Sequence, residues 1–230
     1  MFIAVSNHIR DCLIEQDYPK EKITVHRNGI DLQTFKPKQE KHSEPIIVFV
    51  GRFVEKKGIR YLIDAAAILH AAEVQFELVI IGSGPLEPEL KSMAEKSRIP
   101  CTFTGFLSAE EVREWVSRAR VVAVPSVVAQ DGNSEGLQTI LLEAQAMETP
   151  VVGTIHSGIP EGVIAGKTAE LVEERNVIDL ASRLRSFLES TEKSTQFGQA
   201  GRTFMTENFD MRTQNKKLED MFEMLRSRYR

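Results

Sequence analysis

From Pro45 onward the sequence alternates short aliphatic segments with longer amphipathic ones, and this alternation constrains the fold more than any other feature. The strand-like segments are 46–51, 76–84, 101–107, 121–126 and 150–154, with helix-like segments at 58–72, 87–97, 109–119 and 136–147. Such alternation is typical of βαβ units around a mainly parallel sheet. Because the strand segments are apolar on successive residues, helices should cover both faces. The predicted fold class is α/β, a Rossmann-like parallel sheet with helices on both faces.

The two ends of the chain differ from this pattern. Residues 1–31 predict a strand, a helix opened by Ser6 and a second strand, and the polar stretch Lys36–Pro45 predicts a linker. At the other end, apolar residues at helical spacing predict a helix whose stripe needs a partner surface: Leu218, Met221, Phe222 and Leu225. We therefore divide the chain into three segments, residues 1–38, 39–208 and 209–230.

The composition excludes several classes of protein. A net charge of -4, from 29 basic and 33 acidic side chains, argues against a broad nucleic-acid surface. No apolar run approaches the roughly 20 residues that cross a bilayer, and the N-terminus has no secretory pattern. Cys12 and Cys101 are far apart in sequence and are expected to be unpaired. We expect a cytoplasmic protein, or one that is peripheral at the inner face of the membrane.

The stretch VGRFVEKKG, residues 50–58, predicts an anion site. It places Arg52 and Lys57 between the end of a strand and the start of a helix. An arginine can clamp two oxygens of a diphosphate, and a lysine supplies a point charge. Lys56 is expected to be a solvated surface lysine.

The stretch SEGLQTILLEA, residues 134–144, carries two glutamates eight positions apart. A helix that begins near Leu137 would direct its free N–H groups at an anion, and Glu135 lies just before that start. Glu143 would be about 12 Å farther along the helix, so the pair could hold two parts of one long ligand. The alternative is that Glu135 caps the helix and Glu143 is a solvated position.

Taken together, these motifs resemble the nucleotide-sugar-binding, C-terminal half of the GT-B, family 4 retaining glycosyltransferases. The resemblance rests on VGRFVEKKG, the IGSGP turn, FTGFL, EGLQTILLEA and PVVGT followed by SGIPE. The front end, AVSNHIR and HRNGIDLQTF, is similar to the end of that family's acceptor domain. Residues 126–146 are especially similar to the branch that serves capsular, exopolysaccharide and colanic-acid assembly.

The resemblance implies a role for each matching residue. Arg52, Lys57 and Thr139 would contact the donor diphosphate, and Glu143 the ribose. Glu135 would face the donor sugar as the catalytic residue. Further contacts are implied for three residues beside the sugar and three near the nucleobase: Gly136, Leu137 and Gln138, and Phe106, Leu107 and Gly82 respectively. Gln138 departs from the family, in which a smaller residue is commoner.

The same resemblance implies the domain organisation. Residues 1–38 would be the remnant of the N-terminal acceptor domain with the interdomain linker. Residues 39–208 would be the donor domain, and 209–230 a helix that packs back toward the acceptor domain. The chain alone would bind donor but transfer little or nothing, and it would need the acceptor domain or self-associate through its termini.

The implied function is transfer of a sugar from a nucleoside-diphosphate sugar, such as a UDP- or GDP-sugar, to a glycan or lipid-linked acceptor. No cofactor is expected, since the sequence contains no DxD motif for a metal-bridged diphosphate. A non-catalytic nucleotide-sugar-binding module that works with a separate acceptor chain is the alternative.

Two further parts of the sequence do not predict a function of their own. IGSG at residues 81–84 lacks the third glycine of a dinucleotide-binding motif, which argues against an oxidoreductase. His156, in a loop without an evident acidic partner, is expected to be structural, as is Glu161 after SGIP.

Overall fold

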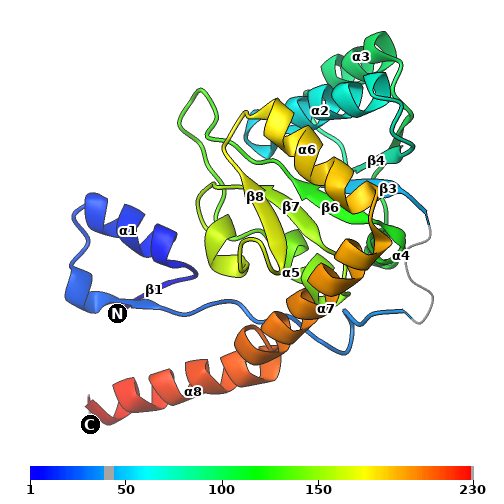
Figure 1. Ribbon diagram of the computed structural model, residues 1–230. Helices are drawn as coiled ribbons and strands as arrows, with labels where there is room; N and C mark the ends of the chain where they lie inside the picture. The colour runs from blue at the N-terminus through cyan, green and yellow to red at the C-terminus, as the bar shows by residue number, and fades with distance from the viewer. Residues whose placement is uncertain (39–43, 229–230) are drawn as a thin grey trace.

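The computed structural model describes residues 1–38 and 44–228, and its centre is a six-stranded sheet in the order β5-β4-β3-β6-β7-β8 (Figure 1). The strands are β3 Ile46–Val50, β4 Glu77–Ile81, β5 Cys101–Gly105, β6 Val121–Val124, β7 Val151–Thr154 and β8 Ala169–Val172. Every neighbouring pair is parallel. The predicted α/β fold is confirmed. Part of the predicted linker Lys36–Pro45, residues 39–43, lies outside the described residues.

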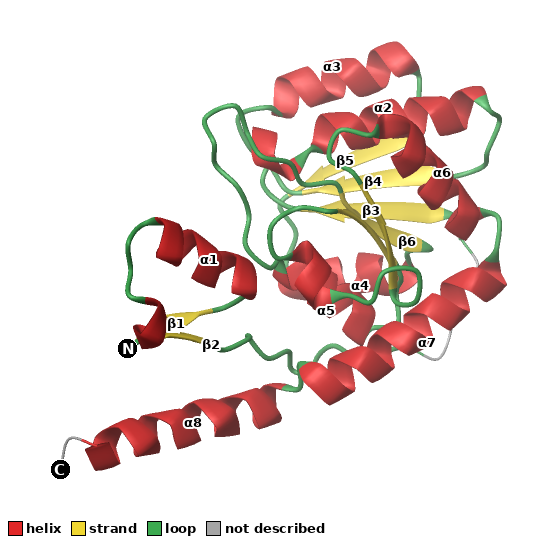
Figure 2. Ribbon diagram, turned by 60° about the vertical axis from the view of Figure 1, so that its left-hand side comes forward, coloured by secondary structure: helices red, strands yellow, loops and turns green. Residues whose placement is uncertain are grey.

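Helices cover both faces of the sheet (Figure 2). One layer contains α2 Ile59–Ala71, α3 Glu87–Ser97 and α6 Val177–Leu188; the other contains α4 Ala109–Arg118 and α5 Thr139–Ala146, with α7 Thr191–Asn208 against α5. Successive strand residues point to opposite faces, so Ile47 and Phe49 pack in the first core and Ile46 and Val48 in the second. This explains why the strands are aliphatic throughout.

Local signals set where helices begin. At α4, the Ser108 hydroxyl accepts from the Glu111 N–H at 3.2 Å, and the Glu111 carboxylate accepts from the Ser108 N–H at 2.8 Å. This capping box satisfies two N–H groups that a helix start leaves free. At α6, the Asn176 side chain accepts from the Asp179 N–H in the same manner.

The first residues form a separate small unit beside the main sheet (Figure 2). Strands β1 Phe2–Ala4 and β2 Ile23–Val25 pair in parallel, and they are connected by α1 Asn7–Glu15 and the short 3-10 helix η1 Lys20–Lys22. The Ser6 hydroxyl accepts from the Ile9 N–H, which caps α1 as the sequence predicted. The predicted strand, helix and strand are all present.

Two segments that are far apart in the sequence meet where this unit joins the main domain. Ile30 donates its N–H to the carbonyl of Phe209 at 2.7 Å, and Met211 donates to the carbonyl of Ile30 at 3.1 Å. The last helix, α8 Met211–Arg228, starts at this meeting point and extends away from the main sheet (Figure 1). Phe222 and Met224 on α8 are more than half exposed.

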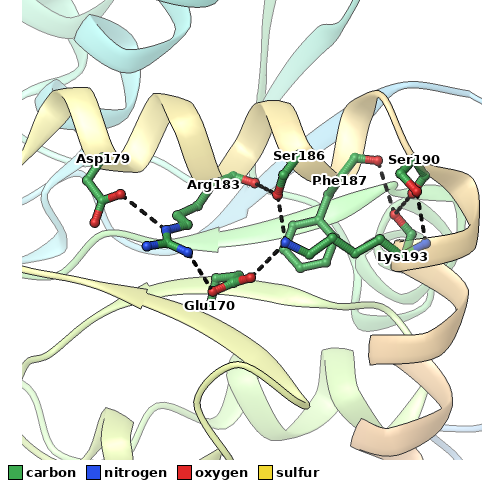
Figure 3. Close-up of polar contacts among 8 residues, drawn as sticks. Glu170, Asp179, Arg183, Ser186, Phe187, Ser190 and Lys193 are labelled. Atoms are coloured by element: carbon green, nitrogen blue, oxygen red, sulfur yellow. Dashed lines mark hydrogen bonds and ion pairs between the residues drawn. The ribbon is translucent and has the colours of Figure 1, made fainter.

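A charged cluster ties β8 to the two helices that follow it (Figure 3). Glu170 on β8 is 9% exposed, and its carboxylate accepts from Lys193 at 2.7 Å and from Arg183 at 3.2 Å. The Lys193 ammonium also lies 4.8 Å from the ring centroid of Phe187, within the range of a cation–π contact. Since α6 and α7 are joined through one carboxylate, the cluster braces the edge of the sheet farthest from α3.

The two cysteines are unpaired, as expected. Burial raises the pKa of the Cys101 thiol to about 12, so it stays protonated at neutral pH. Of the helices in the described part of the chain, none is long and apolar enough to cross a membrane.

Candidate functional site

The candidate residues gather where the strand order reverses. Strands β3 and β6 are neighbours, but β4 and β5 extend from one side of this pair and β7 and β8 from the other. In open α/β sheets, ligands bind in the crevice beyond the carboxyl ends of the strands at such a switch point. The loops that leave β3 and β6, residues 51–58 and 125–138, contain most of the predicted site.

The two loops are fixed to each other by a close backbone approach. The 3-10 helix η2, Glu55–Lys57, ends at Gly58, whose φ is +66°. A Cβ at Gly58 would lie 1.8 Å from the Pro125 carbonyl oxygen, so a side chain has no room there. The N–H of Val127 donates to the Lys56 carbonyl at 3.0 Å. The lysines of η2 are therefore held against the loop that follows β6.

Both lysines of η2 hold the carboxylate of Glu135. The Lys56 ammonium is 3.1 Å from one oxygen and the Lys57 ammonium 3.2 Å from the other. Lys56 also donates to the Asn133 side-chain oxygen and to the Ser134 carbonyl, each at 3.2 Å. The expectation that Lys56 is merely solvated was wrong, because its amine reaches three acceptors on the loop before α5.

Helix α5 begins at Thr139, two residues later than predicted, with Gln138 as the residue before it. The buried Gln138 side chain accepts from Lys57 at 2.8 Å and donates to the Ser126 hydroxyl at 2.6 Å. Gln138 thus joins η2, the end of β6 and the start of α5. Its departure from the family pattern has a structural reason in this chain, since a smaller residue would not reach both partners.

Glu143 lies within α5 and is half-buried. Burial raises the pKa of its carboxyl, against the opposing effects of a hydrogen bond with Thr139 and the positive charge of Arg113. A partly desolvated carboxylate is a strong acceptor for hydroxyl donors, because its own solvation is incomplete. The structure therefore excludes the alternative in which Glu143 is a fully solvated position.

Arg52 is exposed, and its guanidinium forms no ion pair with any residue that the structure describes. It lies directly after β3, on the same loop as the two lysines. The turns after the neighbouring strands are connected by backbone hydrogen bonds, from Gly51 to Ile81 at 3.0 Å and from Gly82 to Gly105 at 2.9 Å. Arg52 could therefore bind an anion at the edge of the sheet where these hydrogen-bonded turns lie.

The residues predicted near the nucleobase lie on the same edge. Gly82 has a φ of +128°, and a Cβ there would be 2.0 Å from the Gly51 carbonyl oxygen. Phe106 is 84% exposed after β5, and the half-buried Leu107 packs against the core. An exposed aromatic ring is available for stacking, and the role of these three residues stays a prediction.

His156 has an acidic partner, contrary to the expectation. Its Nδ1 lies 2.6 Å from a carboxylate oxygen of Glu174, and its Nε2 accepts from the Glu135 N–H at 3.2 Å. This pairing was hard to predict from the sequence, because Glu174 is 18 residues away and follows β8. Both residues are brought to the site by neighbouring strands β7 and β8.

The N-terminal unit also contacts the site. The Glu161 carboxylate, in the 3-10 helix η3 Ile159–Gly162, accepts from the Asn7 and His8 N–H groups at 2.8 Å each. A carboxylate at a helix start satisfies free N–H groups and favours the helix dipole. A Cβ at Gly136 would be 3.9 Å from Ile9 of α1. Glu161 is thus more than a loop residue, since it holds α1 close to Gly136.

Within the described residues, no group of three or more His, Cys, Asp or Glu side chains is arranged to hold a metal ion. Positive charge at the site is supplied by Arg52, Lys56 and Lys57. The N-terminus of α5 adds its free N–H groups.

A doubly wound sheet with a cationic loop and a helix start at its switch point has the arrangement in which open α/β folds bind ligands. Residues 31–204 match the model of the family described as "Glycosyl transferases group 1", and the chain belongs to this family. WcaL of Escherichia coli (strain K12), whose name assigns it to colanic acid biosynthesis, is 35% identical over 90% of this chain and 52% of its own length. The amylovoran biosynthesis glycosyltransferase AmsK of Erwinia amylovora is 32% identical over 98% of this chain and 56% of its own.

Solved structures show the same fold. Anabaena HepE in complex with UDP superposes with a TM-score of 0.85 at 20% identity, over 96% of this chain and 63% of that one. Sucrose-phosphate synthase from Thermosynechococcus elongatus gives 0.84 at 23% identity, over 98% and 58%. The chain spans about half the length of the curated relatives it matches.

Proposed function

We propose that this chain is the donor-binding part of a retaining glycosyltransferase that uses a nucleoside-diphosphate sugar in cell-surface polysaccharide synthesis. The observation that carries the proposal is the contact of Lys56 and Lys57 with Glu135 beside the start of α5, at the switch point of the sheet. Two cations beside a helix start suit a diphosphate. The relatives named for colanic acid and amylovoran synthesis support the polysaccharide product.

In this proposal the cations and N–H donors lie where negative charge develops during the reaction. When the bond between sugar and diphosphate breaks, the diphosphate leaves with the bonding electrons and gains negative charge. Arg52, Lys57 and the N–H groups at the start of α5, including that of Thr139, would stabilise that charge. Fixed donors cost little reorganisation at the moment of reaction.

Two carboxylates would hold the neutral parts of the donor. Glu143 would accept from the ribose hydroxyls, and its partial burial strengthens such bonds. Glu135 would face the donor sugar, with the backbone of Gly136, Leu137 and Gln138 beside it. The Glu135 carboxylate forms ion pairs with Lys56 and Lys57, so a diphosphate would compete with it for both lysines.

The acceptor would be a glycan or a lipid-linked glycan, bound by an acceptor domain that faces this crevice. Transfer needs donor and acceptor side by side, and such proximity contributes roughly 7–11 kcal/mol to lowering a barrier. We therefore expect the 230-residue chain alone to bind donor and to transfer little. We place the reaction in the cytoplasm, at the inner face of the membrane if the acceptor is lipid-linked. The named relatives are glycosyltransferases, which does not favour a non-catalytic module.

The test is a calorimetric titration of the chain with UDP, GDP, UDP-glucose and GDP-mannose. We expect saturable binding of one nucleoside diphosphate and its sugar. Sugar transfer is then measured with and without a separately produced acceptor domain from a full-length relative. Binding of none of the four nucleotides would refute the donor assignment, and robust transfer by a monomer of this chain would refute the need for an acceptor domain.

A further inference from the structure

The loop between β6 and α5 carries Glu135, and both of its ends are held by side chains from outside it. At one end, the Val128 N–H donates to a carboxylate oxygen of Glu174 at 2.9 Å. At the other end, the Glu135 N–H donates to Nε2 of His156 at 3.2 Å. Since His156 itself bonds to the other oxygen of Glu174, these two side chains join the start of the loop to its end.

The bonds assign the tautomer of His156. Burial opposes the ionisation of Glu174, but its hydrogen bonds with His156 and Val128 outweigh that effect and lower the pKa of the carboxyl. An ionised carboxylate only accepts, so Nδ1 of His156 carries the proton. Nε2 then accepts from the backbone N–H of Glu135 at 3.2 Å, and the Ser157 hydroxyl, 3.0 Å from the same nitrogen, can donate to it as well. The His156 side chain is fully buried, which shields both bonds from water.

The segment that follows Glu135 is fixed from the same turn. A Cβ at Gly158 would lie 2.8 Å from the backbone nitrogen of Leu137, so the turn after β7 packs directly on that peptide. The backbone is therefore held on both sides of Gly136, by a hydrogen bond before it and by packing after it. The direction of the Glu135 side chain follows from this backbone.

The contact with His156 differs from the other polar contacts described for Glu135. The Glu135 carboxylate is held by Lys56 and Lys57, the cations that a diphosphate would also contact. An anion bound by those lysines would compete with both carboxylate contacts. The hydrogen bond to His156 involves the backbone and does not depend on the lysines.

We propose that His156 is a positioning residue for Glu135: protonated on Nδ1 by its bond to Glu174, it fixes the Glu135 backbone so that the carboxylate faces the donor sugar once the diphosphate is bound. This inference rests on the proposed function of the site. The expected effect is on the sugar-bearing donor and not on the nucleoside diphosphate.

Two substitutions separate the two nitrogens of the ring. His156→Gln places an oxygen near the position of Nε2, where it can accept from the Glu135 N–H. His156→Asn places an amide near Nδ1, where it can donate to Glu174 but leaves Glu135 without an acceptor. Ser157→Ala is the matched control, because the Ser157 hydroxyl lies 3.0 Å from the same Nε2.

Calorimetry would compare UDP with UDP-glucose, or GDP with GDP-mannose, whichever pair the unmodified chain binds. For His156→Asn we expect the sugar nucleotide to bind roughly three- to tenfold more weakly, the loss of one neutral hydrogen bond, while the nucleoside diphosphate changes less than about twofold. His156→Gln and Ser157→Ala should keep the sugar preference. Equal losses in the Asn and Gln variants, or no loss in either, would overturn the proposal.

A second measurement needs no ligand. Nitrogen NMR of the imidazole should show the Nδ1–H tautomer, and His156→Asn should shift the amide signal of Glu135 more than His156→Gln does. An imidazole protonated at Nε2 would overturn the proposal by itself. If the unmodified chain binds none of the nucleotides, the proposed function fails and the sugar-positioning role fails with it, while the tautomer still reports whether His156 holds Glu135.

Discussion

The ammonium group of Lys57 donates a 2.8 Å hydrogen bond to the side-chain oxygen of Gln138, the residue immediately before α5. Gln138 is held in turn by the Ser126 hydroxyl at 2.6 Å. A flexible lysine side chain is thereby aimed at a helix start before any ligand arrives. Because the lysine side chain is already ordered, binding an anion there costs less side-chain entropy than it would at a mobile lysine.

The first prediction is that Lys57→Ala and Arg52→Ala each weaken nucleoside-diphosphate binding by about 10- to 100-fold, since a charge-assisted bond contributes roughly 1.5–3 kcal/mol. Calorimetry gives the affinity, and circular dichroism confirms the fold. Arg60→Ala is the control, because it removes one positive charge that is paired with Glu89 on the same side of the sheet. Affinity that falls equally in the control would mean that general charge, and no specific site, attracts the nucleotide.

The second prediction is that Glu143 and Glu135 contact different parts of the donor. Glu143→Gln should weaken binding of the free nucleoside diphosphate, because the ribose loses its acceptor. Glu135→Gln should leave that binding unchanged or strengthen it, since Lys56 and Lys57 no longer hold a carboxylate. Only the sugar-bearing donor should bind more weakly to the Glu135 variant. Titrations with both ligands test this division, and the opposite pattern would contradict it.

The third prediction concerns pH and Glu143. Its carboxyl has a raised pKa in the folded chain because of burial. Above pH 4.5, the usual pKa of a glutamate, the native state therefore binds more protons than the unfolded state. The free energy of unfolding should then fall as the pH rises through this window. Urea denaturation at several pH values should show that the free energy of unfolding falls less with pH, or rises more, for Glu143→Gln than for the unmodified chain.

The fourth prediction tests the backbone contact beneath the lysines. Gly58→Ala should destabilise the chain, because a positive φ costs about 1–2 kcal/mol for a non-glycine residue and the clash with Pro125 typically adds about 1–3 kcal/mol. Gly132→Ala is the matched control, with a φ of +79° and no atom within 4 Å of the new Cβ. Thermal melts of the two variants should differ. Equal melting temperatures would show that the Pro125 contact does not constrain η2.

The fifth prediction concerns the contact between α1 and the main domain. Glu161→Ala removes the acceptor of the Asn7 and His8 N–H groups, and losing a helix cap costs roughly 0.5–2 kcal/mol. Hydrogen exchange should therefore accelerate at these two amides and not in β3. Ser6→Ala, which removes the other cap of α1, should accelerate exchange at Ile9 instead.

The fold could be predicted from the sequence because its signals are local. Aliphatic runs such as Ile46–Val50 and capping residues such as Ser6 and Ser108 act within a few positions of the chain. The βαβ pattern predicts parallel strands and restricts the handedness of the crossovers, whereas the strand order β5-β4-β3-β6-β7-β8 comes from the structure. The start of α5 was misplaced by two residues because Gln138, which lies in an extended conformation, has no cap signal in the sequence.

The site was predicted less completely, since its contacts join distant segments. The sequence indicated Arg52, Lys57, Glu135 and Glu143 as candidates, but it gave no sign that Lys56 holds the Glu135 loop. The pairing of His156 with Glu174 depends on the alignment of β7 with β8, which adds a partner from 18 residues away. Reading the turn after each neighbouring strand for complementary side chains would have suggested this pair.

The meeting of two distant segments at Ile30 has a mechanical consequence. The N-terminal unit leaves the main domain at Gly29 and Ile30, and α8 leaves it at Met211, where a Cβ on Gly29 would be 2.4 Å from the Met211 Cα. The two segments share one pivot and two backbone hydrogen bonds. A rotation of the β1–α1–β2 unit about this point would therefore displace the first turn of α8 as well, so the positions of the two ends of the chain are coupled.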